Sequence, residues 1–293
     1  MIESFLHYIT FEKRFSSHTV KSYRNDLYQF NSFLSENFPD LSIAQAKSSC
    51  VRSWVIQLME QSLNTRSVNR KLASLRSFYK FLRKKGLSED DQMQNLHALK
   101  IKKSLPVFVQ EEHMGKLLDN FPFEDNFEGT RDKLVLELLY ATGIRLSELL
   151  ELRSSDVDLF SREIRVLGKR NKERIIPFPK SIGLIIENYQ RFKNNQFLNN
   201  RHDNLIVTNK GEPGYPMFIY RIVKKYLDLI PAVEKKSPHV LRHTFATHLL
   251  DKGADLNAIK ELLGHSNLAA TQIYTHNSLD KLKAIFDQAH PKA

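Results

Sequence analysis

The stretch SPHVLRHTFATHLL, residues 237–250, places three histidines and one arginine within fourteen residues and contains no carboxylate. Its apolar residues recur at a helical spacing, and on that helix His239, Arg242 and His243 share one face at positions i, i+3 and i+4. A zinc site is disfavoured, because valine follows the first histidine where the metalloprotease pattern requires glutamate, and because Arg242 would repel the metal ion. His248 taken alone is better explained by a buried structural network. An arginine on an apolar helix without an acid beside it needs an anion, so the cluster is predicted to bind a negatively charged ligand.

Two further stretches carry residues that suit a phosphate. YATGIRLSELL (140–150) places Arg145 just after a glycine at the start of a predicted helix, and LLGHSNLAATQIYTH (262–276) places His265 after a glycine that ends one, with Tyr274 nine residues later. Arginine binds two phosphate oxygens at once and neutralises the charge of a pentacoordinate transition state. Histidine moves protons near neutral pH, while neighbouring cations and a base favour the phenolate of a tyrosine and so make it a nucleophile.

The whole chain restricts the class of protein to which it can belong. It has 293 residues, enough for two domains, and its one cysteine, Cys50, allows no intrachain disulfide, which fits a reducing cytoplasm. No apolar run approaches the roughly 18 residues that a membrane helix requires, and the N-terminus lacks the pattern of a secretory signal. A cysteine-rich zinc site is excluded, and no membrane insertion is expected.

The positive charge is concentrated in the first third of the chain. Residues 1–103 hold 17 Lys and Arg against 9 Asp and Glu, whereas the other 190 residues hold 27 against 24, within a net charge of +11. A basic module joined to a nearly neutral one indicates that the module binds a polyanion. A membrane surface is the less favoured partner, because the basic residues are spread over several predicted helices.

Helical periodicity runs through this basic part. It predicts helices over 16–38, with Ser17 as the N-cap, over 50–61, and over 64–86, with Gly86 as the stop signal. The third helix has a basic face that is nearly free of acids, which favours phosphate contact over a merely solvated surface. The residues of this face predicted to contact phosphate are Arg70, Lys71, Arg76 and Arg83.

The rest of the chain is expected to combine helices with a small β-structure. The polar stretch that ends at Pro106 predicts a linker, and helices are expected over 110–121 and 130–152. Two β-branched runs around the basic turn GKRNK predict a β-hairpin over 163–179, and 204–209 is a further candidate strand. An apolar stripe near the C-terminus predicts a short helix that packs either on its own domain or on a neighbouring subunit.

Four stretches together resemble the tyrosine recombinases of the λ-integrase family, and among these most closely the Xer recombinases of bacterial chromosomes. They are ATGIRLSEL, LGKRNKERIIPFP, SPHVLRHTFATHLL and LGHSNLAATQIYTH. SSHTVKSYRNDLYQF and SVNRKLASLRSFYKFL extend the resemblance over nearly the whole chain.

The resemblance implies a mainly α fold with a small β-hairpin or sheet. An N-terminal helical bundle (SAM-like, core-binding) over residues 1–100, a linker over 101–107 and an α+β catalytic domain over 108–293 would form a C-shaped clamp on DNA. The residues of the basic face named above would then be DNA-binding residues.

The family's catalytic pattern falls on residues of this chain one by one: Arg145, Lys169, His239, Arg242, His265 and Tyr274. The resemblance implies that Tyr274 attacks a DNA phosphate and forms a 3′-phosphotyrosyl link, with neither ATP nor metal, and that Glu148 orients the site. The hairpin turn reads Gly168-Lys169-Arg170 where relatives have a second glycine. Lys172 is therefore an alternative to Lys169 as the acid.

The implied partner is double-stranded DNA with inverted-repeat half-sites. The implied assembly is a homo- or hetero-tetramer on two DNA sites, with a second related recombinase as one option for the partner. The implied role is site-specific recombination of the Xer type, which resolves chromosome dimers. A mobile-element integrase of the same chemistry, a topoisomerase-like relaxer of DNA and a non-cleaving DNA-binding protein remain as alternatives.

Overall fold

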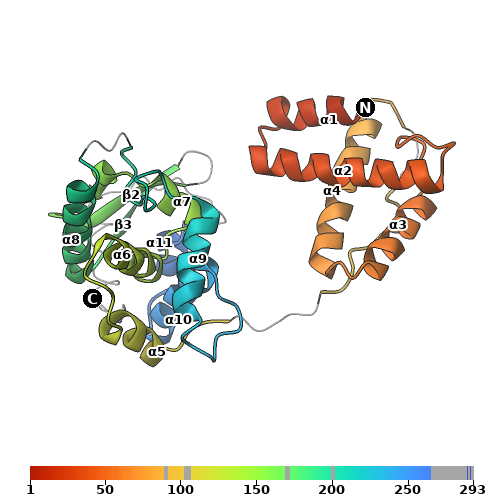
Figure 1. Ribbon diagram of the computed structural model, residues 1–293. Coiled ribbons are helices and arrows are strands. Elements are labelled where there is room, and N and C mark those ends of the chain that lie inside the picture. Colours follow the sequence, from red (N-terminus) through yellow and green to blue (C-terminus); the bar gives the residue numbers. More distant parts are fainter. Residues whose placement is uncertain are drawn as a thin grey trace. The chain divides into compact units, whose positions relative to one another are not determined.

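The computed structural model describes residues 1–88, 92–101, 107–168, 172–198 and 202–264, together with Ala289 and Pro291. Contacts between Cα atoms divide the chain into two compact units, Met1–Ser104 and Leu105–Ala293 (Figure 1). The division falls within 101–107, the stretch predicted as the linker. Both units are mainly helical and the second contains a small sheet, which confirms the predicted mainly α fold with a small β-sheet. Within the described residues, no helix is both long and apolar enough to cross a membrane.

The N-terminal unit is a bundle of helices. Its elements are α1 (Ile2–His7), the π-helical turn η1 (Tyr8–Glu12), α2 (Ser17–Asn37), α3 (Ser48–Glu60) and α4 (Thr65–Lys84). The three predicted helices are therefore confirmed. The N-cap of α2 is Ser16 and not Ser17, because Ser16 is the last residue with an extended backbone, and its side chain accepts a hydrogen bond from the N–H of Thr19 at 3.3 Å. Gly86 follows α4 in the left-handed region at φ +68°, as a stop signal should.

A buried carboxylate joins α2 to α4 in this bundle. Asp26 is fully buried, and it accepts hydrogen bonds from Lys71 Nζ at 3.2 Å, from Ser74 Oγ at 2.8 Å and from Arg70. Lys71 itself is 5% exposed. The prediction that Lys71 contacts DNA is therefore wrong, because its ammonium group neutralises a buried charge instead of facing solvent.

Residues 92–101 pack along α4. The side chain of Asn69 exchanges hydrogen bonds of 2.8 and 2.9 Å with the backbone of Leu99, and Arg76 Nη2 donates to the carbonyl oxygen of Leu96 at 3.0 Å. The bond from Arg76 holds this segment on the bundle. Arg76 is exposed, and its contact with DNA phosphate stays a prediction.

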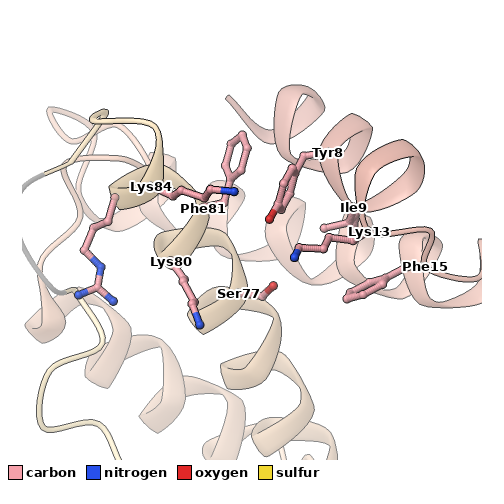
Figure 2. A pocket seen from close by; sticks show the side chains of 9 residues that line it. Tyr8, Ile9, Lys13, Phe15, Ser77, Lys80, Phe81 and Lys84 are labelled. Carbon is pink, nitrogen blue, oxygen red and sulfur yellow. The ribbon is translucent and has the colours of Figure 1, made fainter.

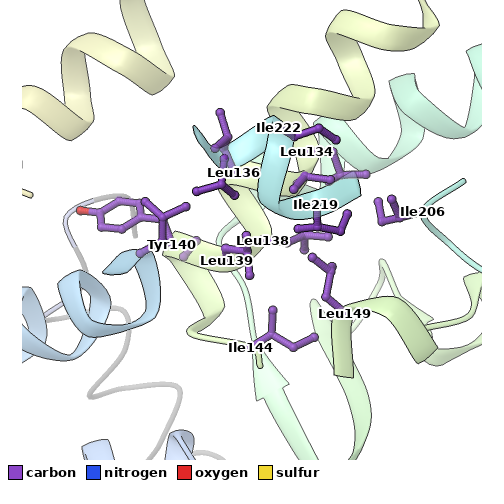
Figure 3. Packing of buried hydrophobic residues seen from close by; sticks show 14 of the residues in the cluster. Leu134, Leu136, Leu138, Leu139, Tyr140, Ile144, Leu149, Ile206, Ile219 and Ile222 are labelled. Carbon is purple, nitrogen blue, oxygen red and sulfur yellow. The ribbon is translucent and has the colours of Figure 1, made fainter. Parts of the chain in front are cut away.

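Helix α6 is the centre of the second unit. It spans Phe127–Thr142, and its neighbours are α7 (Leu146–Glu151), α8 (Lys180–Gln196), α9 (Pro216–Leu227) and α10 (Pro238–Asp251). Apolar residues lie all round α6, as expected for a helix that is covered on every side. Figure 3 shows Leu134 and Leu138 of α6 packed with Ile219 of α9, while Leu149 of α7 and Ile144 lie below them in this view.

The sheet has three antiparallel strands in the order β1-β2-β3. They are β1 (Val157–Asp158), β2 (Glu163–Gly168) and β3 (Lys172–Pro177). The predicted hairpin is thus confirmed, although its turn, with Lys169, lies outside the described residues. The strand predicted over 204–209 is wrong: its residues form isolated bridges to two different segments, and residues 205–207 are buried in succession instead of alternating.

Short elements complete the second unit. They are α5 (Glu111–Gly115), the π-helical turn η2 (Lys116–Asn120), the 3₁₀ turn η3 (Ser154–Asp156) and α11 (Leu256–Leu262). The helix predicted over 130–152 is divided into α6 and α7 at Gly143, which has φ +57°. A Cβ atom there would lie 2.5 Å from the ring of Phe245, so both the conformation and the packing require glycine.

We expect Gly143→Ala to lower the free energy of unfolding more than Gly253→Ala. Both glycines have left-handed backbones, so each substitution introduces strain of about 1–2 kcal/mol. Only the first also forces Phe245 to move, which adds about 1–3 kcal/mol, because nothing lies within 4 Å of a Cβ at Gly253. Urea denaturation of the two variants measures the difference, and equal losses would contradict it.

Candidate active site

Arg145 lies at the start of α7, just after Gly143 ends α6 with a left-handed backbone. It is the N-cap of α7, and its backbone N–H donates to Glu148 Oε2 at 2.8 Å. Its guanidinium donates to Glu148 Oε1 at 2.8 Å and to the carbonyl oxygen of Gly264 at 2.7 Å. The side chain of Arg145 is 29% exposed, so it is only partly shielded from solvent.

Glu148 is held by a second arginine, Arg174 of β3. The two side chains are almost fully buried and form a bidentate pair, with N···O distances of 2.6 and 2.8 Å. Burial by itself raises the pKa of Glu148, but the hydrogen bonds and charge of Arg174, assisted by Arg145, lower it to about 2. Glu148 is therefore ionised across the physiological range.

Arg242 of α10 is the third arginine of the cluster. It is 9% exposed and donates to the carbonyl oxygens of Gly143 and of Leu263, the latter at 2.6 Å. Burial and the positive charges of Arg145 and Arg174 lower the pKa of Arg242 to about 10, so it stays charged at neutral pH. Three guanidinium groups and one carboxylate leave the cluster with an excess of two positive charges, which favours binding of an anion.

One turn supplies carbonyl groups to all three arginines. Arg174 Nε donates to Leu262 at 3.2 Å, while Arg242 and Arg145 bond the next two carbonyls, of Leu263 and Gly264. Gly264 has φ +62°, and a Cβ there would lie 3.2–3.3 Å from the side chains of two of these arginines. The turn therefore requires glycine, and it fixes the point from which the chain continues towards His265 and Tyr274.

The histidines of α10 differ in environment. His239 is exposed in the first turn, two residues after the N-cap, and His243 is half-buried. His248 is buried, lies 3.0 Å from the hydroxyl of Tyr140 through Nδ1, and packs edge-on against Phe108. Burial lowers the pKa of His248. These contacts agree with the structural network predicted for it.

The structure brings together Arg145, Glu148 and Arg242 from the predicted set, with His239 on the same helix as Arg242. Lys169, His265 and Tyr274, and also the side chain of Lys172, lie outside the described residues. Arg174 is the residue that the sequence analysis did not single out. The two-residue period of the strand could have identified it. Arg174 lies two residues before the buried Ile176 and opposite Val166, so its side chain is on the buried face of the sheet, where a cation needs a carboxylate.

The geometry suits phosphate better than metal. Among the residues described, no three His, Cys, Asp or Glu side chains are grouped so that they could hold a metal ion. Fixed guanidinium groups in a partly water-excluded site can instead bind the oxygens of a phosphate and stabilise the additional charge of its transition state.

Comparisons with known proteins match both units. Residues 108–280 match the phage integrase family, and residues 2–86 match the phage integrase N-terminal SAM-like domain. The chain is 41% identical over 292 residues to tyrosine recombinase XerC of Staphylococcus epidermidis, covering 99% of this chain and 97% of that protein. It is 37% identical over 317 residues to tyrosine recombinase XerC of Chlorobaculum parvum, covering 100% and 94%.

Solved structures share the fold. A post-cleavage complex of the XerH site-specific recombinase bound to palindromic difH substrate superposes with a TM-score of 0.72 at 22% identity, covering 90% of this chain and 78% of that one. The Tn1549 transposon integrase in complex with transposon right end DNA gives a TM-score of 0.69 at 20% identity, covering 97% and 98%.

We expect Glu148 and Arg174 to be energetically coupled. Arg174→Met alone leaves a buried carboxylate without its bidentate partner and should cost about 3–5 kcal/mol of folding free energy. The double variant Glu148→Gln, Arg174→Met should lose less than the sum of the two single losses. Urea denaturation completes the cycle, and Arg165→Met, an exposed arginine on β2, is the matched control. Strictly additive losses would show that the pair does not act as a unit.

Proposed function

Since the chain belongs to the phage integrase family of tyrosine recombinases, we propose that it is a site-specific recombinase that cuts and rejoins DNA through a 3′-phosphotyrosyl intermediate. The observation that carries this proposal is the cluster of Arg145, Arg174 and Arg242 around Glu148, whose excess positive charge lies at the turn leading to Tyr274. A protein that only gripped DNA from outside would not need buried, preorganised guanidinium groups at that turn.

Arg145 and Arg242 bind the non-bridging oxygens of the scissile phosphate. A guanidinium has five N–H donors, and the hydrogen bonds given above for each of these two arginines use two nitrogens. Donors therefore remain for the substrate while the others hold each side chain in place. Arg174 does not need to touch the DNA: it keeps Glu148 ionised, and Glu148 positions Arg145.

The chemistry exchanges one phosphodiester bond for another. The hydroxyl oxygen of Tyr274 bonds to phosphorus, its proton passes to His239, and the 5′-oxygen leaves with a proton from Lys169, or from Lys172 as the alternative. His265 supports the phosphate oxygens. The reverse steps, with a 5′-hydroxyl from another strand, restore the DNA. Because the bond energy is kept in the phosphotyrosine, the cycle uses neither ATP nor metal.

The partner is duplex DNA with inverted-repeat half-sites, bound by a ring of four subunits on two sites. Resolution of chromosome dimers in the cytoplasm is the role supported by the similarity to XerC proteins. A hetero-tetramer with a second related recombinase is the alternative to a homotetramer, and a mobile element is an alternative setting for the same chemistry.

Of the predicted C-terminal helix only Ala289 and Pro291 are described, and Ala289 is buried in its own chain's cluster with Phe245 and Ile259. This contact favours a tail that packs on its own domain.

We expect Tyr274→Phe to abolish covalent attachment to DNA. The change removes one oxygen, so folding and DNA binding should persist. The measurement is a denaturing gel of protein incubated with a nicked duplex, whose site is selected by the full-length protein from a random-sequence pool. A DNA-linked band retained by the variant would rule out Tyr274 as the nucleophile, and transfer of the DNA to a second duplex by the wild type distinguishes recombination from simple relaxation.

We expect Arg145→Ala and Arg242→Ala each to slow cleavage by on the order of 10²–10³. Lysine at either position should not restore the rate, because a single ammonium cannot reproduce the two-pronged contact. Single-turnover cleavage of the nicked duplex at saturating protein measures the effect, with Arg165→Ala as the control. A variant that cleaves at the wild-type rate would show that its arginine does not bind the phosphate.

A further inference from the structure

A second basic site belongs to the N-terminal unit, whereas the arginine cluster belongs to the other unit. It is a pocket of about 650 Å³ between the α1–η1 segment and the second half of α4. The residues that matter for its chemistry are Tyr8, Lys13, Ser77, Lys80, Phe81 and Lys84. Figure 2 shows the amino group of Lys13 and the hydroxyls of Tyr8 and Ser77 directed at the same space, with Lys80 at its lower edge.

Three lysines line this pocket. Lys13, Lys80 and Lys84 are exposed, and none of them forms an ion pair with a carboxylate among the residues that the structure describes. Lys80 and Lys84 are four residues apart on α4, a spacing at which like charges repel. The amino groups of Lys13 and Lys84 both lie near the ring of Tyr8, 5.8 and 5.7 Å from its centroid. The positive charges of these amino groups would attract an anion that enters the pocket.

Other cations of α4 are already occupied. Arg70 and Lys71 pair with the buried Asp26, and Arg76 donates to the carbonyl oxygen of Leu96. They therefore have less capacity for a ligand than the sequence pattern indicated. Lys80 and Lys84 of the pocket lie on the same helix, and neither forms an ion pair among the described residues, so their amino groups remain available as donors.

The backbone at the edge of the pocket is strained. Arg14, between the lining residues Lys13 and Phe15, has φ +51°, a conformation that favours glycine. It ends η1 with the bonding pattern of a helix C-cap, in which Phe15 N–H donates to Ile9 at 2.9 Å. Glycine would relieve this strain, yet the position carries an exposed arginine next to the pocket.

We infer that this pocket binds one backbone phosphate of the duplex, with Lys13, Lys80 and Lys84 and the Ser77 hydroxyl as donors and Arg14 at its edge. The inference rests on the proposed function and adds to it a defined contact in the N-terminal unit. A phosphodiester meets the requirement for a compact anion, and the volume has room for the adjoining sugar. The contact carries no sequence information and fixes how the N-terminal unit is registered on the DNA.

The salt dependence of binding tests the charge of the site. The triple variant Lys13→Gln, Lys80→Gln, Lys84→Gln should reduce the slope of log K against log salt concentration by about 0.9, the loss of one phosphate contact. The matched control is Lys85→Gln, which neutralises an exposed neighbour on α4 that does not line the pocket and should leave the slope nearly unchanged. If Lys85→Gln lowers the slope by as much as one third of the effect of the triple variant, the effect comes from the overall charge and not from the pocket, and the inference fails.

Neutral methylphosphonates placed one at a time in the selected duplex test the contact itself. At one position in each half-site, the methylphosphonate should weaken DNA binding by the wild type but not by Lys80→Gln, because the variant has already lost the contact with that phosphate. If every position weakens wild type and variant equally, the pocket binds no phosphate. This failure would leave the proposed function intact, because covalent attachment through Tyr274 is measured separately on the same duplex at saturating protein.

Arg14→Gly separates binding from folding. The substitution should leave the melting temperature unchanged or raise it, because it relieves the left-handed strain, and it should weaken DNA binding several-fold. Unchanged affinity would remove Arg14 from the site. Lowered stability would show that the arginine is kept for folding, and would overturn the argument from strain.

Discussion

The buried pair of Glu148 and Arg174 is the interaction on which the rest of the site depends. A carboxylate this deep is tolerated only if its charge is neutralised, and Arg174 does so through two short hydrogen bonds. The ionised Glu148 accepts hydrogen bonds from both the backbone N–H and the guanidinium of Arg145. These two bonds fix the start of α7 and the orientation of the Arg145 side chain together. The same Arg174 bonds the turn after α11. One ion pair therefore joins the sheet, α7 and the approach to Tyr274.

The apolar core holds these polar groups at the right separation. Helix α6 ends at Gly143. The carbonyl oxygen of Gly143 accepts a hydrogen bond from Arg242 of α10, and the absence of a side chain at this position leaves space for Phe245. Since α6 is covered by helices on all sides, its end is a rigid point in the unit. The arginines can then be held by backbone carbonyls, which lack the freedom of side-chain partners, and little reorganisation is needed when a phosphate binds.

The N-terminal unit uses charge in a different way. There a buried carboxylate, Asp26, fixes two helices through Arg70 and Lys71, whereas Lys80 and Lys84, further along α4, form no ion pair with a carboxylate in the described part of the chain. Along one helix the basic residues thus divide into those that hold the bundle together and those that remain available to DNA. A count of charges in the sequence does not distinguish the two groups.

The sequence by itself determined the helices and the hairpin and predicted the residues of the site, because these depend on local periodicity and on residue types whose chemistry is specific. The apolar spacing of α2 and α4, the two β-branched runs around GKRNK, and the order of Arg145, His239 and Arg242 needed no partner from elsewhere in the chain. Burial and ion pairing were decided by the tertiary structure, since both depend on what a residue meets across the fold. Arg70 and Lys71 both reach the carboxylate of Asp26, over 44 and 45 residues, and Arg174 reaches Glu148 over 26. Only the packed structure brings such separated charges into one low-dielectric interior, where each must find its counter-ion.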